Sequence, residues 1–247
     1  MTFKDYFSGH ARVYADARPT YPDELYAYLS EITIDHGVAW DCATGNGQTA
    51  VSLAPIFDRV IATDGSAKQL ESAPSVVNVD YEVALAEQSP LASGSVDLVT
   101  VSQALHWFDL PRFFAEVERV LKPGGVLAIW SYGIHSIEPA VDQLVDELYR
   151  DTLDGYWTEE RRMVEQGYAN VVFPFTELIT PQISMNVNWT QGQLESYLRS
   201  WSATDKYIRA NGEDPVTLLS SRLTPVWQVG SKQVNWPLVL FARRKPR

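Results

Sequence analysis

The fold of this chain is decided by the stretch Val38-Ala39-Trp40-Asp41-Cys42-Ala43-Thr44-Gly45-Asn46-Gly47-Gln48-Thr49-Ala50. A short apolar run ends in an acid and then passes through two glycines, which predicts a strand, a tight loop and a helix N-terminus. Glycine lets the backbone approach a ligand closely, and the first turn of a helix offers unpaired N–H groups and a partial positive charge. The stretch therefore predicts a loop that binds a nucleotide-like ligand.

A second strand is expected at residues 59–63, and Asp64 follows it directly, 19 residues after Gly45. In nucleotide-binding α/β units, an acid about 20 residues beyond the glycines holds the ribose hydroxyls. We therefore predict that Asp64 and the adjoining Gly65 contact a ribose; the alternative for Asp64 is a cap for the helix after Ser66. The loop alone leaves three hypotheses open: a nicotinamide or flavin cofactor, S-adenosylmethionine (SAM), or a glycine turn that binds no nucleotide.

Strands and helices alternate through the first half of the chain, with short connections between them. This alternation predicts an α/β fold with a doubly wound, Rossmann-like sheet of mostly parallel strands. Asp109 and Pro111 predict the start of a helix that stops at Lys122-Pro123-Gly124-Gly125. The other elements are expected as strands at 38–42, 77–85, 96–101 and 126–131, and as helices at 22–32, 47–55 and after 66.

The pattern changes after Tyr132, where acidic helical segments and one extended stretch replace the regular alternation. Pro237 in the last apolar run favours an edge or bulge position in a strand. We predict a core with an N-terminal lid at 1–133, a helical cap or substrate subdomain inserted at 134–225, and a closing strand of the core sheet within 226–247. Within the cap, helices are expected at 138–152, 158–167, 191–202 and 215–222, and an extended stretch at 171–189.

The composition excludes several classes of function. The net charge is −11 and no dense basic run precedes the tail Arg243-Arg244-Lys245, so nucleic acid is not expected as a partner. No apolar run reaches the roughly 18 residues of a membrane span, and the N-terminus lacks a signal pattern. A single cysteine, Cys42, fits a reducing compartment and a buried small residue. We expect a cytoplasmic monomer or homodimer without a metal ion and without membrane contact.

With the strands placed, the chain resembles the class I SAM-dependent methyltransferases, and among them the small-molecule group that includes the trans-aconitate methyltransferases. Two positions depart from the family pattern: Ala43 stands at the first glycine of the loop, and Leu85 stands where an acid often receives the adenine amino group. The segments that carry the resemblance are the loop 41–47, Asp64, Ala86-Glu87-Gln88-Ser89-Pro90-Leu91, Gln103-Ala104-Leu105-His106-Trp107, Leu121-Lys122-Pro123-Gly124-Gly125 and Arg18-Pro19-Thr20-Tyr21-Pro22.

The resemblance implies SAM as cofactor and a seven-stranded sheet whose last strand is antiparallel. The two extended segments near the end of the chain are expected to supply this antiparallel hairpin. A nicotinamide enzyme more often continues the parallel alternation, so these segments favour SAM. Asp41 is implied to hold the methionine ammonium, directly or through water, the alternative being an acid that caps the loop. The implied cofactor site consists of Asp41, Ala43, Gly45, Gly47, Asp64, Gly65, Ala86, Glu87, Gln103 and Tyr14.

The substrate side is predicted from residue chemistry. His106 is the candidate catalytic residue, as a base or as a group that orients the substrate, unless it only packs beside Trp107. Arg18 and Arg199 are candidates for holding a substrate carboxylate, since the guanidinium fork suits that group; the alternative for both is surface ion pairing. Tyr21, Trp107 and Trp201 are predicted to line the substrate pocket, with the alternatives of a helix staple for Tyr21 and core packing for the tryptophans.

We therefore predict SAM-dependent methyl transfer to a small-molecule acceptor, with a carboxylate as the suggested class. Methyl transfer from a sulfonium is an in-line displacement in which positioning and a closed pocket do much of the work. Two alternatives stay open at this stage: a nicotinamide-dependent oxidoreductase, and a non-catalytic module that binds SAM or a nucleotide.

Overall fold

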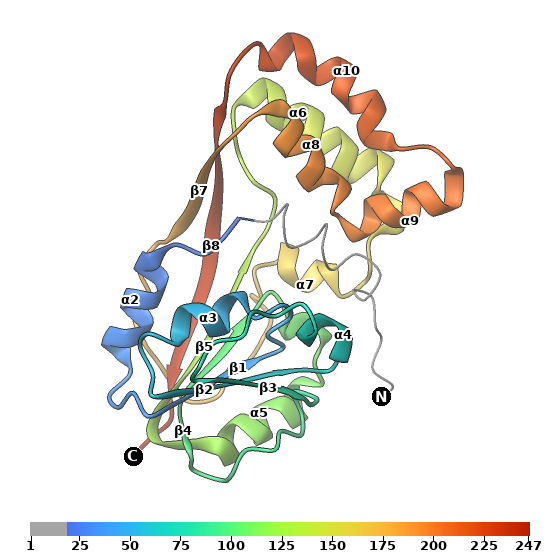
Figure 1. The fold of residues 1–247 in the computed structure, drawn as a ribbon. Helices are drawn as coiled ribbons and strands as arrows, with labels where there is room; N and C mark the ends of the chain where they lie inside the picture. The colour runs from blue at the N-terminus through green and yellow to red at the C-terminus, as the bar shows by residue number, and fades with distance from the viewer. Residues whose placement is uncertain (1–18) are drawn as a thin grey trace.

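A computed structural model describes residues 19–247, and it shows a twisted sheet with helices on both faces and a group of helices beyond one end (Figure 1). The strands are β1 (Val38–Cys42), β2 (Arg59–Asp64), β3 (Val79–Val83), β4 (Val96–Ser102), β5 (Leu121–Tyr132), β6 (Thr176–Glu177), β7 (Ser184–Trp189) and β8 (Lys232–Arg244). The α-helices are α2 (Asp23–Ile32), α3 (Gln48–Leu53), α4 (Ala67–Leu70), α5 (Leu110–Val120), α6 (Pro139–Glu147), α7 (Arg161–Glu165), α8 (Gln191–Arg199), α9 (Ser202–Asn211) and α10 (Pro215–Trp227).

The sheet confirms the predicted fold class. Its strands follow the order β3-β2-β1-β4-β5-β8-β6, and the first five are mutually parallel. The chain order reverses between β1 and β4, and such a switch point opens a crevice for ligands outside the carboxyl ends of the strands. The glycine loop follows β1, so the fold places it at this crevice.

Burial explains why the central strands form. β1 and β4 are buried along almost their whole length, as expected for apolar runs covered on both faces. Helices α2 and α3 pack with Leu25 and Leu53 on one face, and α5 packs with Phe113 and Val117 on the other. The predicted start of α5 is confirmed, because Asp109 accepts a hydrogen bond from the backbone N–H of Arg112.

The antiparallel side of the sheet is larger than predicted. The final strand β8 is antiparallel to β5, as expected, but β6 and β7 also pair with β8 and bring the sheet to eight strands. The predicted cap segment 134–225 therefore contributes two strands to the sheet as well as its helices. Pro237 lies where the pairing of β8 with β5 ends, so its missing N–H interrupts no hydrogen bond to that neighbour.

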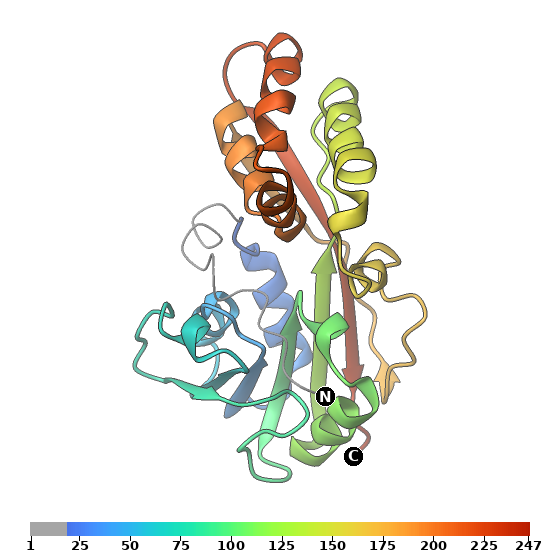
Figure 2. The same cartoon turned by 90° about the vertical axis from the view of Figure 1, so that its right-hand side faces the viewer.

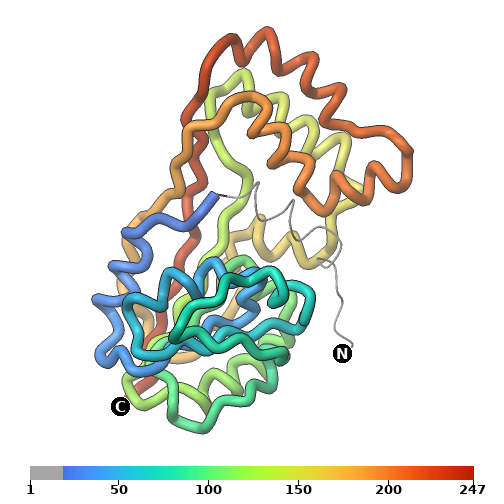
Figure 3. Tube along the Cα trace, viewed as in Figure 1, coloured from blue at the N-terminus to red at the C-terminus, as the bar shows by residue number. Residues whose placement is uncertain are grey.

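The helices α6, α8, α9 and α10 stand beyond the carboxyl ends of the parallel strands (Figure 2), and we call them the cap. The segment after β5 and the first half of β8 run side by side into the cap (Figure 3), and Ser136 and Asn235 there exchange two backbone hydrogen bonds of 2.9 Å. No helix among residues 19–247 combines the length and apolarity needed to cross a bilayer. The cap helices share an aromatic core with the ends of β7 and β8, and it includes Tyr149, Trp189, Tyr197, Trp201, Trp227 and Trp236.

Candidate active site

The glycine loop lies at the carboxyl end of β1, where the strand order reverses. Three of its residues adopt left-handed backbone: Ala43 at φ 55°, Gly45 at φ 60° and Gly47 at φ 82°. Glycine adopts this conformation readily. For a residue with a side chain, the same conformation costs on the order of 1–3 kcal/mol of stability and persists only where the surrounding structure imposes it. Ala43 thus holds the backbone conformation for which the family's glycine is suited.

The two glycines have different surroundings. A β-carbon built on Gly45 meets no atom within 4 Å, so open space lies next to this residue. A β-carbon built on Gly47 would lie 2.6 Å from the hydroxyl oxygen of Tyr81 on β3, well inside van der Waals contact. Gly45 therefore has open space beside it, which we call the cradle, while a side chain at position 47 would displace Tyr81. Binding of the predicted nucleotide-like ligand at the cradle stays a prediction.

Asp41 lies beneath this loop and is fully buried. Its two carboxylate oxygens accept hydrogen bonds from the hydroxyls of Thr44 and Thr100, which joins the loop to β4. Burial raises the pKa of Asp41 to about 6, and the two threonine hydrogen bonds oppose that rise. The carboxylate therefore anchors the loop and is mainly charged above that pH; its contact with a methionine ammonium stays a prediction.

Asp64 connects the ends of the first two strands. One carboxylate oxygen accepts the N–H of Gly45 at 2.9 Å, and the other accepts the N–H of Ser66 at 2.8 Å. The side chain is half-buried and adjoins the cradle at Gly45. The bond to Ser66 ties the acid to the start of α4, as the capping alternative expects, and the contact of Asp64 and Gly65 with a ribose stays a prediction.

The segment predicted to lie beside an adenine forms a turn after β3. Leu85 and Gln88 form a backbone bridge, and Ala86 between them is buried. Glu87 Oε1 accepts a hydrogen bond of 2.8 Å from the backbone N–H of Asp109. The Glu87 carboxylate therefore joins this turn to the start of α5, next to the segment that carries His106.

Gln103 follows β4 with a left-handed backbone of its own, at φ 53°. Its N–H donates to the carbonyl oxygen of Trp130 at 3.0 Å, and its Nε2 donates to that of Tyr132 at 2.9 Å. These two bonds fasten the end of β4 to the end of β5. Strained backbone thus occurs at Ala43 and Gln103, after the two strands that flank the switch point, and strain of this kind collects at ligand sites.

His106 lies in a short 3₁₀ turn, Leu105–Trp107, after β4. Its Nδ1 is 3.2 Å from the hydroxyl oxygen of Tyr168, and its ring centroid is 4.7 Å from that of Trp107. Burial, with the positive charge of Arg161 as second cause, lowers the pKa of His106 to about 3. His106 is therefore neutral at physiological pH, and the half-buried Trp107 packs directly against it.

Of the N-terminal candidates Tyr14, Arg18 and Tyr21, only Tyr21 lies within the described residues. Tyr21 lies shortly before α2 and packs edge to face on Trp130 and Tyr132, at centroid distances of 5.5 and 6.4 Å. Tyr21 therefore covers the end of β5, beside the bonds made by Gln103. Tyr14 and Arg18, with most of the predicted lid, lie outside the described residues.

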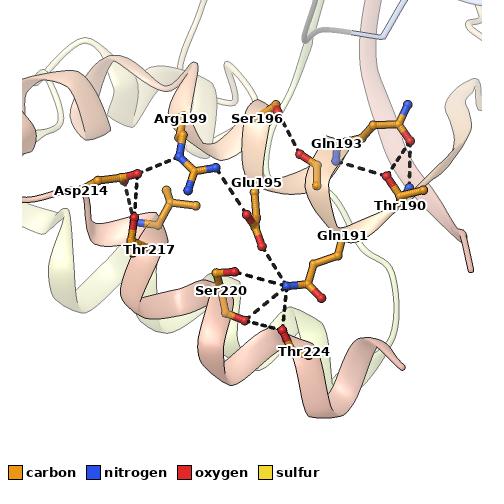
Figure 4. A network of polar contacts seen from close by, with 12 residues as sticks. Thr190, Gln191, Gln193, Glu195, Ser196, Arg199, Asp214, Thr217, Ser220 and Thr224 are labelled. Atoms are coloured by element: carbon orange, nitrogen blue, oxygen red, sulfur yellow. Dashed lines mark hydrogen bonds and ion pairs between the residues drawn. The ribbon is translucent and has the colours of Figure 1, made fainter. Parts of the chain in front are cut away.

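Arg199 belongs to a polar network on the cap (Figure 4). Its Nε donates to Asp214 at 2.7 Å and its Nη1 donates to Glu195 at 3.4 Å, while Asp214 also accepts the N–H of Val216 and so caps α10. The guanidinium is committed to two carboxylates, which corresponds to the ion-pair alternative. The structure therefore does not offer Arg199 as a free anion-binding group.

Two residues that the sequence did not single out lie near His106. Tyr168 is buried and follows α7, and Arg161 on α7 donates from Nε to the hydroxyl of Tyr149 at 3.0 Å. The Arg161 guanidinium lies 5.3 Å from the ring of Trp157, and no Asp or Glu of residues 19–247 forms an ion pair with it. Trp201 packs on the same Trp157 ring at 5.6 Å, buried in the cap core. No local sequence pattern marks these contacts, because they depend on how the cap meets the sheet.

Known proteins share both the sequence and the shape of this chain. A family model described as a methyltransferase domain matches residues 40–129, from β1 to β5. A Dictyostelium discoideum protein named as a methyltransferase is 36% identical over 252 residues, covering 98% of this chain and 96% of that protein.

Solved structures agree with the sequence matches. A structure from Anaeromyxobacter dehalogenans, described as a type II methyltransferase, has a TM-score of 0.87 and 39% identity, covering 93% of this chain and 99% of that one. The phosphoethanolamine N-methyltransferase 2 of Haemonchus contortus, solved with phosphomonomethylethanolamine and S-adenosylhomocysteine, has a TM-score of 0.54 and 19% identity, covering 100% of this chain and 61% of that one; this likeness shows the fold alone. These matches decide against the nicotinamide alternative, and the chain belongs to the class I SAM-dependent methyltransferase family.

Proposed function

We propose that this methyltransferase transfers the methyl group of SAM to a small molecule. The observation that carries the proposal is the cap, which stands beyond the carboxyl ends of the parallel strands (Figure 2). Gly45 follows β1, Asp64 ends β2 and His106 follows β4, so all three lie at these strand ends. A cap over such a crevice makes an enclosed site of the kind that small ligands occupy. A net charge of −11 also disfavours the long-range attraction of nucleic acid.

Different residues of the core bind different parts of SAM in this proposal. Gly45 lets the loop backbone approach the cofactor, Gly47 lets the loop pack against Tyr81 in the shape that this approach needs, and Asp64 accepts hydrogen bonds from the ribose hydroxyls. Asp41 supplies negative charge near the methionine ammonium, and the turn at Ala86 and Glu87 borders the adenine. SAM supplies a methyl group on a positively charged sulfur, so the protein's own task is to align the acceptor atom and to exclude water.

The acceptor molecule carries a carboxylate in this proposal. The resemblance to the trans-aconitate methyltransferases suggests an acid, and Arg161 offers a guanidinium that has no ion-pair partner in residues 19–247. It adjoins the Tyr149 and Trp157 rings and lies near enough to His106 to affect its pKa. Arg161 and the sequence candidate Arg18 therefore replace Arg199 as the groups that hold the anion.

A methylation assay with labelled SAM tests the proposal on tRNA, DNA, a protein extract and a panel of small acids, alcohols, phenols and amines. We expect label in small molecules, and robust transfer to a macromolecule instead would overturn the small-molecule claim. Arg161→Met should raise KM for the acid at least about tenfold, the loss of a charged hydrogen bond of about 1.5–3 kcal/mol. The matched variant Arg199→Met should leave KM unchanged, and the reverse pattern would move the anion site to the cap network.

We also propose a cytoplasmic protein that is a monomer or homodimer. The single cysteine, Cys42, is buried in β1, and burial raises the pKa of its thiol, so it is poorly suited to disulfide exchange. Light scattering coupled to size-exclusion chromatography measures the oligomeric state. A trimer or larger assembly would contradict this part of the proposal.

A further inference from the structure

Arg161 is a half-buried cation where α7 meets the cap. Helix α7 packs against the turn Leu105–Trp107, which carries His106. The Nε atom of Arg161 donates a hydrogen bond of 3.0 Å to the hydroxyl oxygen of Tyr149, whose ring belongs to the aromatic core of the cap. Nη1 and Nη2 of Arg161 form no hydrogen bond with residues 19–247. Two donors of the guanidinium are thus left for a ligand close to the turn that carries His106.

The hydroxyl of Tyr149 links Arg161 to a carboxylate on the same helix. Arg161 and Glu165 are four residues apart on α7, a spacing at which opposite charges come within reach of each other. No ion pair joins them in the described part of the chain; instead, the Tyr149 hydroxyl accepts from Nε of Arg161 and donates to Oε1 of Glu165. Both directions are fixed by chemistry, because a guanidinium only donates and a carboxylate only accepts. The hydroxyl therefore takes the place of a direct ion pair and leaves Nη1 and Nη2 unused.

Tyr149 is itself held in place by its backbone and by a neighbouring ring. It lies in a π-helical turn, Leu148–Thr152, directly after α6, and such turns are rare and occur frequently at functional sites. Its carbonyl oxygen accepts the indole N–H of Trp157 at 3.0 Å, and the centroids of the two rings are 4.4 Å apart. The guanidinium carbon of Arg161 lies 5.3 Å from the centroid of Trp157 and 5.8 Å from that of Tyr149, within the range of cation–π attraction. The rings and the hydroxyl thus fix the orientation of the guanidinium.

We propose that Tyr149 and Glu165 are positioning residues, which hold Arg161 so that its Nη1 and Nη2 atoms face a carboxylate of the substrate; this rests on the proposed function, in which Arg161 binds that group. Because Nε is already bonded to Tyr149, the paired hydrogen bonds that a guanidinium forms with a carboxylate come from Nη1 and Nη2. A side chain that is oriented in advance loses less freedom when the ligand binds. Glu165 is exposed to solvent, so water screens its charge from the bound anion.

Removal of one hydroxyl tests the proposal. Tyr149→Phe keeps the ring that packs on Trp157 and Trp201, but it lets Glu165 pair directly with Arg161 and compete with the substrate. We expect KM for an acid acceptor from the panel to rise about three- to tenfold, the worth of one hydrogen bond, while kcat stays within about twofold. KM for the primary amide of the same acceptor, which carries no charge, should not change.

A second substitution separates positioning from packing. Glu165→Gln, added to Tyr149→Phe, removes the charge that competes for Arg161, so it should reverse most of the rise in KM. A packing defect at Tyr149 predicts no such recovery. Tyr156→Phe is the matched control, because its hydroxyl bonds Asn211 on the cap, and its KM should equal that of the wild type. An unchanged KM in Tyr149→Phe overturns the proposal, and so does a rise that Glu165→Gln fails to reverse.

Nitrogen NMR on the full chain, labelled with ¹⁵N-arginine, gives a result that needs neither turnover nor a folded Tyr149→Phe. The Nε–H signal that is missing from Arg161→Met belongs to Arg161, and we expect it to exchange with water more slowly than the Nε–H of the exposed Arg162. Exchange as fast as that of Arg162 overturns the proposal. If no acid is methylated, the carboxylate class of the proposed function fails, whereas the spectrum still decides whether Tyr149 holds Arg161.

Discussion

Alanine substitutions at the two loop glycines should separate ligand binding from folding. Gly45 and Gly47 both have left-handed backbone, where an alanine costs about 1–2 kcal/mol and recovers about 0.4–1 kcal/mol through a less flexible unfolded chain. The new β-carbon in Gly45→Ala meets no atom within 4 Å, so the net loss of folding stability is about 1 kcal/mol. Gly47→Ala sets a β-carbon 2.6 Å from the Tyr81 hydroxyl oxygen, and overpacking adds about 1–3 kcal/mol to that loss.

Ligand binding should reveal what the cradle at Gly45 is for. The new methyl group in Gly45→Ala occupies the space in which we place the cofactor, so the affinity for S-adenosylhomocysteine should fall at least about tenfold, or 1.4 kcal/mol. Urea unfolding measures the free energy of each variant, and titration calorimetry measures binding. Ala43→Gly is the control, because it removes a methyl group at φ 55° and should keep both stability and binding.

Two results would refute this reasoning. The first is a Gly45→Ala protein that binds S-adenosylhomocysteine as tightly as the wild type, because the cradle would then hold no part of the cofactor. The second is a Gly47→Ala protein no less stable than Gly45→Ala, because the 2.6 Å approach to Tyr81 would then have no energetic consequence.

Three further predictions concern charged residues. Burial raises the pKa of Asp41 to about 6 from the ordinary value of 3.8, so its contribution to stability is present below pH 3.8 and is lost as the pH rises through 6, roughly 3 kcal/mol in all. Asp41→Asn should flatten urea stability across that window, and an unchanged pH slope would contradict the buried proton. Asp64→Ala should weaken S-adenosylhomocysteine binding by about 1–3 kcal/mol in calorimetry, whereas the exposed acid Asp58→Ala should not; equal effects would remove Asp64 from the site. Arg199→Ala should lower stability by about 1 kcal/mol or less and leave turnover intact, since its ion pairs are partly exposed; lost turnover in a stable variant would return Arg199 to the substrate site.

The elements of the core could be predicted from the sequence because the signals for them are local. The core is marked by signals that span only a few residues and need no distant partner. They are the apolar runs of four to eight residues, the glycines after the first run, and the helix start at Asp109 and Pro111. The spacing from Gly45 to Asp64 follows from the length of one helix and one strand, so the contact of these residues at 2.9 Å is a consequence of the chain order. Helix α9 was not predicted, because it buries only Ala203 and Thr204 and so has no apolar stripe.

The antiparallel edge and the cap depended on tertiary structure. The alternating residues 184–189 indicate a strand, and its expected hairpin with the closing strand is confirmed, but only the assembled sheet shows the register and the added pairing of β6 with β8. Arg199 illustrates the same dependence: a lone arginine in a sequence suits a substrate anion or an ion pair, and the loop that brings Asp214 to it decides between them.

The chain by itself determined the parallel α/β class of the core, the glycine loop and the acid that follows it, because those features depend on short-range patterns and on the rules for parallel α/β units. Tertiary structure alone decided the environment of His106. Tyr168 is 62 residues away in the sequence, and its left-handed backbone is imposed by packing that no local propensity predicts. The glycine loop and Asp64 follow from local patterns, whereas His106 and Tyr168 meet only in the assembled structure.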